Sequence, residues 1–276
     1  MKIAVSGLGL IGGSFYNASL RAGYEVKGLH HNESDGLSEA DLVIVAQPPA
    51  AIVPWVKANA ANFKPGAIVF DICGTKRRIV RDLGEFLAIE KSRNRKIEKF
   101  SFVGGHPMAG REVSGYENSL ATLFDGASMI ITPFPGTDER IIKTLKAYFA
   151  SVGFHETVVT TPEKHDEMIA FTSQLCHVIA TTYARDPRVK EAIGFTAGSY
   201  ANMTRIATQD AAVWRALYSE NRDALVQVLD GFIDRFQALR GAIAADDAKQ
   251  VEAMIEEGTR AKRQELLDRK RGDENV

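Results

Sequence analysis

A histidine set between small residues is the first side chain in this sequence that could move a proton. His106 stands in the segment GGHPMAG at 104–110, directly after an apolar run typical of a strand. A neutral imidazole accepts a proton near physiological pH, and open α/β sheets bind ligands beyond the carboxyl ends of parallel strands. We therefore expect His106 to be a general base in a ligand-binding loop; a structural loop histidine is the alternative.

A second group of polar side chains recurs at helical spacing after Pro162. At about 100° per residue, Asp166, Ser173 and His177 fall within roughly 20° of one direction on a helix over 162–184. The rest of this helix is mostly apolar, and a polar stripe on a mostly buried helix must be paired or must line a cavity. We expect Ser173 and His177 to belong to an active site, with a solvated polar face as the alternative.

An arginine and a glutamate complete the candidate site. Arg205 lies among small and apolar residues at 198–207, where its planar guanidinium could bind a carboxylate. The alternative for Arg205 is a structural ion pair. Glu112 follows the His106 segment and either gates a pocket or faces solvent.

A glycine motif indicates a dinucleotide. The stretch at 7–12 matches G-x-G-x-x-G between a predicted strand and a predicted helix. The first glycine permits a tight turn, the second lets the backbone approach a pyrophosphate, and the third lets helix and strand pack closely. A glycine-rich turn without a ligand is the alternative. The expected contacts with NAD or NADP are Gly7, Leu8, Gly9, Leu10, Ile11 and Gly12, together with Gln47 and Pro48 after the third strand.

The second strand ends in His30 and His31, where NAD-binding folds usually carry a carboxylate for the ribose 2′-hydroxyl. A histidine tolerates a 2′-phosphate better than a carboxylate does, because like charges repel. We expect both histidines to contact the cofactor, with a slight lean towards NADP or dual use. The stretch from Asn32 to Asp41 is too short for a crossover helix, which predicts an open adenine end.

The elements that position these residues alternate in the first half of the chain. Strands are predicted at 3–5, 24–29, 41–46, 67–72, 100–103, 128–132 and 155–160, with helices over 11–22 and 138–152. This alternation predicts an α/β fold with an N-terminal Rossmann-type, doubly wound, mostly parallel sheet. The later pattern is helical, over 162–184, 211–241 and 246–268. We expect a dinucleotide-binding domain at 1–160 and an all-helical domain at 161–276.

Composition excludes several classes of function. A net charge of −1 over 276 residues gives no electrostatic footprint for nucleic acid or for an anionic membrane. No run of about 18 apolar residues could span a bilayer. Two cysteines cannot form a disulfide framework, and the N-terminus has no signal-peptide pattern, so we expect a cytoplasmic protein. Metal binding is unsupported, since neither H-x-x-E-H nor a Cys/His cluster occurs.

Taken together, the motifs resemble the prephenate/arogenate dehydrogenase family. They cover the chain from residue 1 to about residue 222 and occur in family order. The HPMAG segment combined with the S-x-L-x-H helix is specific to the family, whereas the glycine loop is not. The segments are GLGLIGGS at 7–14, DICGTK at 71–76, GGHPMAGREVSG at 104–115, HDEMIAFTSQLCH at 165–177, and TRIA at 204–207 with Asp210 and Trp214.

The resemblance implies a two-domain enzyme of tyrosine biosynthesis that decarboxylates prephenate or arogenate oxidatively with NAD(P). It implies a small-molecule substrate and a homodimer formed by the helical domain. It further implies that His106 accepts a hydrogen bond from the ring hydroxyl and that Ser173 and His177 lie near substrate and nicotinamide. Arg205 would bind the substrate, with Glu112 at the mouth of the pocket.

The sequence departs from the family pattern beside the expected base. A serine that usually helps to hold the ring hydroxyl is here Gly74, so either Thr75 or a water makes that contact. The usual Leu-Pro-His is here Leu175-Cys176-His177. The choice between prephenate and arogenate stays open.

Two other functions also stay open. One is a different dehydrogenase with a Rossmann and a helical domain, acting on a 3-hydroxy acid or an imine. Such enzymes use a lysine near the domain junction, where Lys164 is the only candidate. The other is a dinucleotide-binding regulator without chemistry, which would have no reason to combine His106 with a polar stripe around His177.

Overall fold

A computed structural model describes residues 1–30, 33–92 and 100–274 of the chain, with side chains described up to Arg269. The chain divides into two compact units, Met1–Leu225 and Val226–Val276. All the residues of the candidate site lie in the first unit. The change from α/β to helical structure near residue 160 also falls inside this unit, so the predicted domain boundary there stays a prediction.

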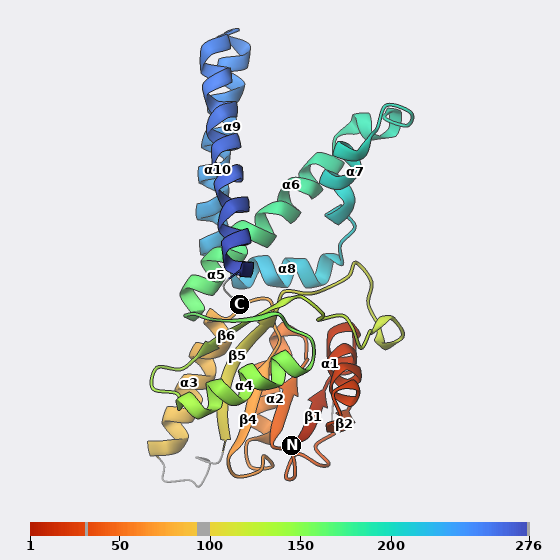
Figure 1. The fold of residues 1–276 in the computed structure, drawn as a ribbon, viewed down its shortest axis with the longest axis vertical. Coiled ribbons are helices and arrows are strands. Elements are labelled where there is room, and N and C mark those ends of the chain that lie inside the picture. Colours follow the sequence, from red (N-terminus) through yellow and green to blue (C-terminus); the bar gives the residue numbers. More distant parts are fainter. Residues whose placement is uncertain (31–32, 93–99, 275–276) are drawn as a thin grey trace. The chain divides into compact units, whose positions relative to one another are not determined.

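Seven strands form one sheet in the order β2-β1-β3-β4-β5-β6-β7 (Figure 1). Neighbouring strands are parallel except β5 and β6, which confirms the predicted mostly parallel sheet. The strands are β1 (Lys2–Ser6), β2 (Glu25–Leu29), β3 (Leu42–Val45), β4 (Ala67–Asp71), β5 (Phe100–Pro107), β6 (Ser128–Pro133) and β7 (Glu156–Val159).

Helices cover both faces of the sheet, because its central strands are apolar on both sides. Helices α1 (Leu10–Arg21) and α4 (Glu139–Ser151) supply buried side chains to the core on one face. Helices α2 (Pro49–Asn59) and α3 (Arg77–Ser92) do so on the other. The predicted doubly wound arrangement is confirmed.

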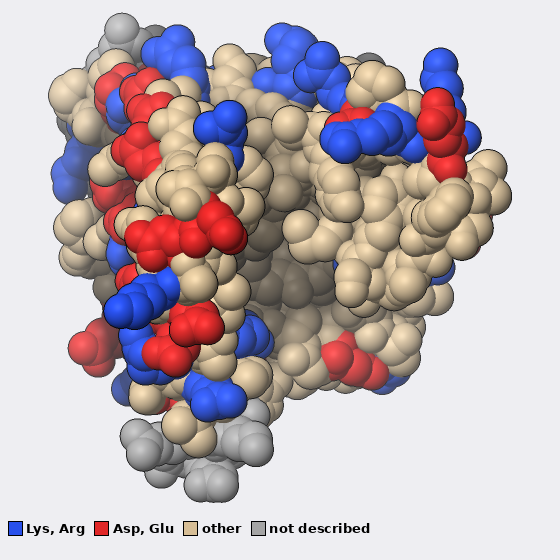
Figure 2. Space-filling model, turned by 90° about the horizontal axis from the view of Figure 1, so that it is seen from above, with Lys and Arg blue, Asp and Glu red and all other residues tan. Residues whose placement is uncertain are grey.

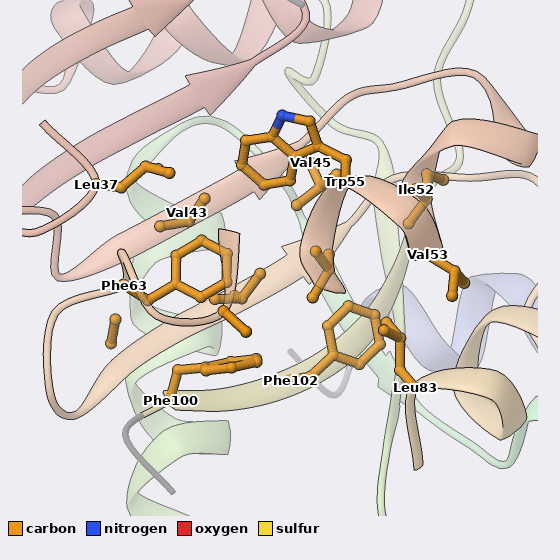
Figure 3. Packing of buried hydrophobic residues seen from close by; sticks show 14 of the residues in the cluster. Leu37, Val43, Val45, Ile52, Val53, Trp55, Phe63, Leu83, Phe100 and Phe102 are labelled. Carbon is orange, nitrogen blue, oxygen red and sulfur yellow. The ribbon is translucent and has the colours of Figure 1, made fainter. Parts of the chain in front are cut away.

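The core under α2 and α3 is aromatic at its centre (Figure 3). Trp55 of α2 and Leu83 of α3 are buried in one cluster with Val43, Phe100 and Phe102 of the sheet. This packing supports the carboxyl ends of β3, β4 and β5, where part of the candidate site lies.

The connection from β2 to β3 is short. In its described part, residues 33–41, it forms turns and no helix, as the sequence predicts. Leu37 and Ala40 are buried there in the same core as Phe63. A few apolar side chains therefore cover the part of the sheet where a crossover helix would otherwise lie.

The described residues after β7 form helices and no strand. The predicted helix over 162–184 has these limits but widens at 170–174 into a π-helical turn. The predicted helix over 211–241 is two helices, because Asn221 leaves the helical path and donates to Asp166 O and Gln174 Oε1, at 2.8 and 2.9 Å. The elements are α5 (Pro162–Ile169), α6 (Leu175–Ala184), α7 (Gly198–Thr204), α8 (Ala211–Glu220), α9 (Arg222–Ala244) and α10 (Ala248–Glu274), with 3-10 turns at Tyr116–Asn118, Pro187–Glu191 and Arg205–Ala207.

Surface charge is mixed. Figure 2 shows acidic and basic side chains close together at the left and along the edges of the face seen from above, with mostly uncharged residues between them. Among the described residues, no helix has both the length and the apolar character needed to cross a bilayer. Within the same ranges, no group of three or more His, Cys, Asp or Glu is placed to hold a metal ion.

Candidate active site

The glycine loop joins β1 to α1 beside the end of β3. A Cβ on Gly7 would lie 2.3 Å from Ala46 O, and one on Gly12 would lie 1.9 Å from Gly7 O, so neither position accepts a side chain. Gly7 also has a φ of +94°, which favours glycine. A Cβ on Gly9 would meet nothing within 4 Å, and Gly9 caps α1 without a side-chain hydrogen bond. The loop therefore leaves the helix N-terminus open, as a pyrophosphate requires.

The other expected cofactor residues surround this loop. Leu10 and Ile11 form the first turn of α1, Leu10 being buried and Ile11 half-buried. Gln47 follows β3, is 7% exposed, and donates to Ser6 Oγ at 2.7 Å. Pro48 is exposed and precedes α2. These residues fit a dinucleotide because Gly7 and Gly12 leave no room for side chains in the loop that would face it.

The tip of β2 contacts the glycine loop. Gly7 N donates to Leu29 O at 3.1 Å, which ties the glycine loop to this strand. The chain then returns, and Glu33 Oε2 accepts from His30 N at 2.9 Å. No carboxylate stands on the last residue of the strand, as expected, but the Glu33 carboxylate contacts the backbone N–H of the residue that follows it. The lean towards NADP or dual use stays a prediction. His31 lies outside the described residues.

His106 lies in β5 rather than in a loop. The strand extends four residues beyond the predicted end at Val103, and His106 pairs with Ile130 of β6. The extension depends on glycine, because a Cβ on Gly105 would lie 2.6 Å from Asp71 O. Only a residue without a side chain lets β5 run this close to the end of β4. His106 is thereby held by strand pairing.

A buried series of hydrogen bonds ends on His106. His106 Nδ1 lies 2.9 Å from His165 Nε2, and His165 Nδ1 lies 2.7 Å from Asp166 Oδ1. His165 and Asp166 are 2% and 1% exposed. Asp166 also accepts from the backbone N–H groups of Lys76 and Arg77, at 2.7 and 2.9 Å. Both carboxylate oxygens thus act as acceptors.

This series fixes the tautomer of His106. Because Asp166 accepts, His165 must donate through Nδ1, and its Nε2 then accepts when the ring is neutral. His106 Nδ1 must therefore donate, which leaves the lone pair on His106 Nε2. Burial lowers the pKa of His106 well below its usual value, and His165 and the Lys76 charge lower it further. Burial also lowers the pKa of His165, although its hydrogen bond to Asp166 acts in the opposite direction. These contacts and the lowered pKa favour a neutral His106 imidazole with Nε2 as its acceptor atom.

A buried ion pair supports the segment beneath this series. Lys76 and Asp71 form a salt bridge with both side chains fully buried. Asp71 also accepts from Cys73 N at 2.9 Å and from Gly105 N at 3.3 Å. Removing one partner of such a pair leaves an uncompensated buried charge, which costs about 3–5 kcal/mol. The pair therefore holds the DICGTK segment against β5.

Gly74 faces the acceptor edge of His106. A Cβ on Gly74 would lie 3.8 Å from both Cε1 and Nε2 of His106, and 3.4 Å from Leu217 Cδ2. Thr75 beside it is 2% exposed and donates its hydroxyl proton to Glu220 Oε2 at 2.6 Å. The Thr75 hydroxyl thus joins the segment to α8, and Gly74 borders the space next to Nε2.

A second cluster gathers around His177. Its ring stacks on Trp214, with centroids 3.6 Å apart and planes at 32°. Burial lowers the pKa of His177; a hydrogen bond with the Ile206 backbone and the Glu112 charge raise it, and the Arg205 charge lowers it. Arg205 and Glu112 form an ion pair with each other. Three of the predicted site residues, His177, Arg205 and Glu112, are therefore within electrostatic reach of one another.

Helix α8 contacts both clusters. Leu217 lies beside Gly74 at the His106 end, and Trp214, about one turn earlier, lies on His177. The expected stripe is not continuous, because the π-helical turn at 170–174 changes the angle between residues. Ser173 lies half-buried within that turn.

Two site residues were missed from the sequence. His165 lies about 100° around the helix from the stripe that includes Asp166, so helical spacing did not select it. Its position directly before Asp166 was the available signal. Glu220 contacts Thr75 and Arg78 across 145 and 142 residues of sequence, and no local pattern marks it.

Family models match most of the chain. The model described as "Prephenate dehydrogenase, nucleotide-binding domain" matches residues 16–159, and "Prephenate dehydrogenase, dimerization domain" matches residues 161–257. A prephenate dehydrogenase of Bacillus subtilis is 26% identical over 90% of this chain and 72% of its own length. A cyclohexadienyl dehydrogenase of Zymomonas mobilis is 28% identical over 94% of each chain.

Solved structures show the same fold. A prephenate dehydrogenase from Aquifex aeolicus, in complex with hydroxyphenyl propionate and NAD+, has a TM-score of 0.79 at 25% identity, over 96% of this chain and 98% of that one. A putative prephenate dehydrogenase from Corynebacterium glutamicum has a TM-score of 0.81 at 26% identity, over 96% and 89%.

Proposed function

The chain belongs to the prephenate dehydrogenase family, and on that premise we propose that it decarboxylates prephenate or arogenate oxidatively with NAD(P). The products would be 4-hydroxyphenylpyruvate or tyrosine, with carbon dioxide. The relatives named as prephenate and cyclohexadienyl dehydrogenases support this activity. The observation that carries it is the Asp166–His165–His106 series, which leaves a neutral imidazole nitrogen to accept a proton.

Each candidate residue has a separate role in the proposed reaction. His106 accepts the proton of the ring hydroxyl through Nε2, next to the space that Gly74 leaves open. Arg205 binds a substrate carboxylate at the mouth of the pocket, where it also forms an ion pair with Glu112. His177 and Ser173 line the site near the substrate and the nicotinamide. Orientation and one proton acceptor suffice, because formation of an aromatic ring draws the decarboxylation forward.

The glycine loop holds the cofactor. Gly7 and Gly12 leave no room for side chains, and Gly9 leaves the approach to α1 open. The nicotinamide, when bound, supplies the hydride acceptor. Thr75 is engaged with Glu220 and serves to hold the segment that carries Gly74. The contact with the ring hydroxyl that Thr75 or a water was expected to make is therefore assigned to a water beside Gly74.

The family and the composition support proposals for the assembly and the location. We assign residues 1–160 to dinucleotide binding and 161–276 to a helical domain that forms a homodimer, consistent with the dimerization-domain match over 161–257. The cytoplasm is the proposed location, and the two cysteines, Cys73 and Cys176, are free thiols.

No observation favours the other dehydrogenase class. Lys164, the lysine that it would use, pairs with Glu167 at 2.9 Å, and both side chains are more than half exposed. That lysine lies at the surface and is already paired with a carboxylate.

A direct assay tests the proposal. The purified protein is mixed with prephenate or arogenate and with NAD+ or NADP+, and the near-UV absorbance of the reduced nicotinamide is followed. We expect turnover with at least one of the four combinations, and carbon dioxide released in equal amount. Binding of a nucleotide without turnover of either substrate would contradict the proposal and would favour a regulator.

A further inference from the structure

A carboxylate contacts the end of β2, although the residue that follows the strand is a histidine. NAD-binding folds usually place this group on the last residue of the strand, which here is followed by His30. Glu33 lies three residues beyond, yet its Oε2 accepts from His30 N at 2.9 Å. A carboxylate therefore contacts the backbone N–H of the first residue after the strand.

This carboxylate lies next to the glycine loop. Gly7 N donates to Leu29 O at 3.1 Å, and Leu29 directly precedes the residue that Glu33 contacts. Leu8 of the loop packs over Gly28 of β2, where an added Cβ would lie 2.7 Å from Leu8 Cδ1. The motif that binds the pyrophosphate and the carboxylate at the strand tip are thus joined by backbone and side-chain contacts.

The lysine of β2 does not offset this negative charge. Lys27 forms an ion pair with Asp35 and lies against Gly36, where an added Cβ would be 2.7 Å from Lys27 Cδ. Its ammonium is therefore engaged by another carboxylate. Glu33 is exposed, and a carboxylate has about four acceptor positions, so the bond to His30 N leaves capacity for further donors.

We propose that Glu33 accepts hydrogen bonds from the adenosine ribose of the cofactor and makes the chain prefer NAD over NADP. The inference rests on the proposed nucleotide-dependent function and specifies its cofactor. A hydroxyl donating to a carboxylate forms a charge-assisted bond, whereas a 2′-phosphate brings a second anion to the same place. The backbone N–H of His30 donates to Glu33 and holds its carboxylate at the end of the strand. The carboxylate oxygens are the acceptors offered to the ribose.

Binding measurements on the full-length protein test this inference without turnover. Dissociation constants for NAD+ and NADP+ are measured by isothermal titration calorimetry for the wild type, for Glu33→Gln and for Asp35→Asn. Asp35→Asn is the matched control, because it removes an exposed carboxylate two residues away that pairs with Lys27.

We expect the wild type to bind NAD+ at least about tenfold more tightly than NADP+. Glu33→Gln should weaken NAD+ binding about tenfold and so reduce the ratio of the NADP+ to the NAD+ dissociation constant. Asp35→Asn should leave that ratio unchanged. A wild type that binds NADP+ as tightly as NAD+, or a ratio unchanged in Glu33→Gln, would overturn the inference. Failure of both nucleotides to bind any of the three proteins would overturn the proposed function itself.

Discussion

His165 Nε2 lies 2.9 Å from His106 Nδ1, and this contact decides which nitrogen of His106 can accept a proton. Asp166 holds the other side of His165 and receives two backbone N–H groups of its own. The three side chains come from β5 and α5, so the site forms only when the helical segment packs on the sheet.

The first prediction concerns His165 as a positioning residue. His165→Leu removes the acceptor for His106 Nδ1–H, so the tautomer with Nε2 free is no longer enforced. We expect kcat to fall about tenfold or more, with KM little changed. The loss should be smaller than the roughly 10²–10⁴-fold contribution of a general base, because His106 itself is kept. Steady-state kinetics on the folded variant provide the measurement.

Asp166→Asn gives an independent check on the same series. An amide nitrogen turned towards His165 would favour the opposite tautomer of both rings. We expect kcat to fall in this variant too. A folded His165→Leu protein with wild-type kcat would show that His106 needs no partner.

The second prediction concerns pH. A base must be neutral to accept a proton, and burial lowers the pKa of His106 well below its ordinary value. The acid limb of kcat/KM should therefore lie below the usual histidine value of about 6.5, with activity retained as the pH falls through that value. A profile of kcat/KM from pH 4.5 to 9 tests this. An acid limb at or above the usual histidine value would contradict a neutral His106.

The third prediction concerns Arg205. An anchor that binds the substrate equally in the ground and transition states affects KM more than kcat. Arg205→Ala should raise KM about tenfold or more, by loss of a charge-assisted hydrogen bond. Arg188→Ala is the matched control, because Arg188 also forms an ion pair with a carboxylate, Asp186, but outside the site. Equal KM values for the two variants would assign Arg205 to structure.

Most of the fold could be predicted from the sequence, because its signals are local. The continuous apolar runs at Leu42–Val45 and Ala67–Asp71 are buried on both faces, and the glycine loop follows a strand and opens a helix as its spacing predicts. The helix predicted over 138–152 begins directly after Asp138, whose side chain accepts a hydrogen bond from Arg140 N.

The features that could not be predicted depend on contacts between distant residues. The π-helical turn at 170–174 breaks the helical period, and the bonds of Asn221 to α5 and to that turn split a predicted helix. His106 lies in a strand because Gly105 lets β5 approach Asp71. The contact between the Glu33 carboxylate and His30 N could not be predicted from the order of residues alone.

The kinetics of His106→Asn measure the central claim most directly, with saturating prephenate or arogenate and the preferred nicotinamide. We expect kcat to fall by roughly 10²–10⁴-fold, with the fold and nucleotide affinity kept. His155→Asn, which changes an exposed histidine before β7, should leave kcat unchanged. A folded His106→Asn protein with near-normal kcat would remove His106 from the mechanism and contradict the account.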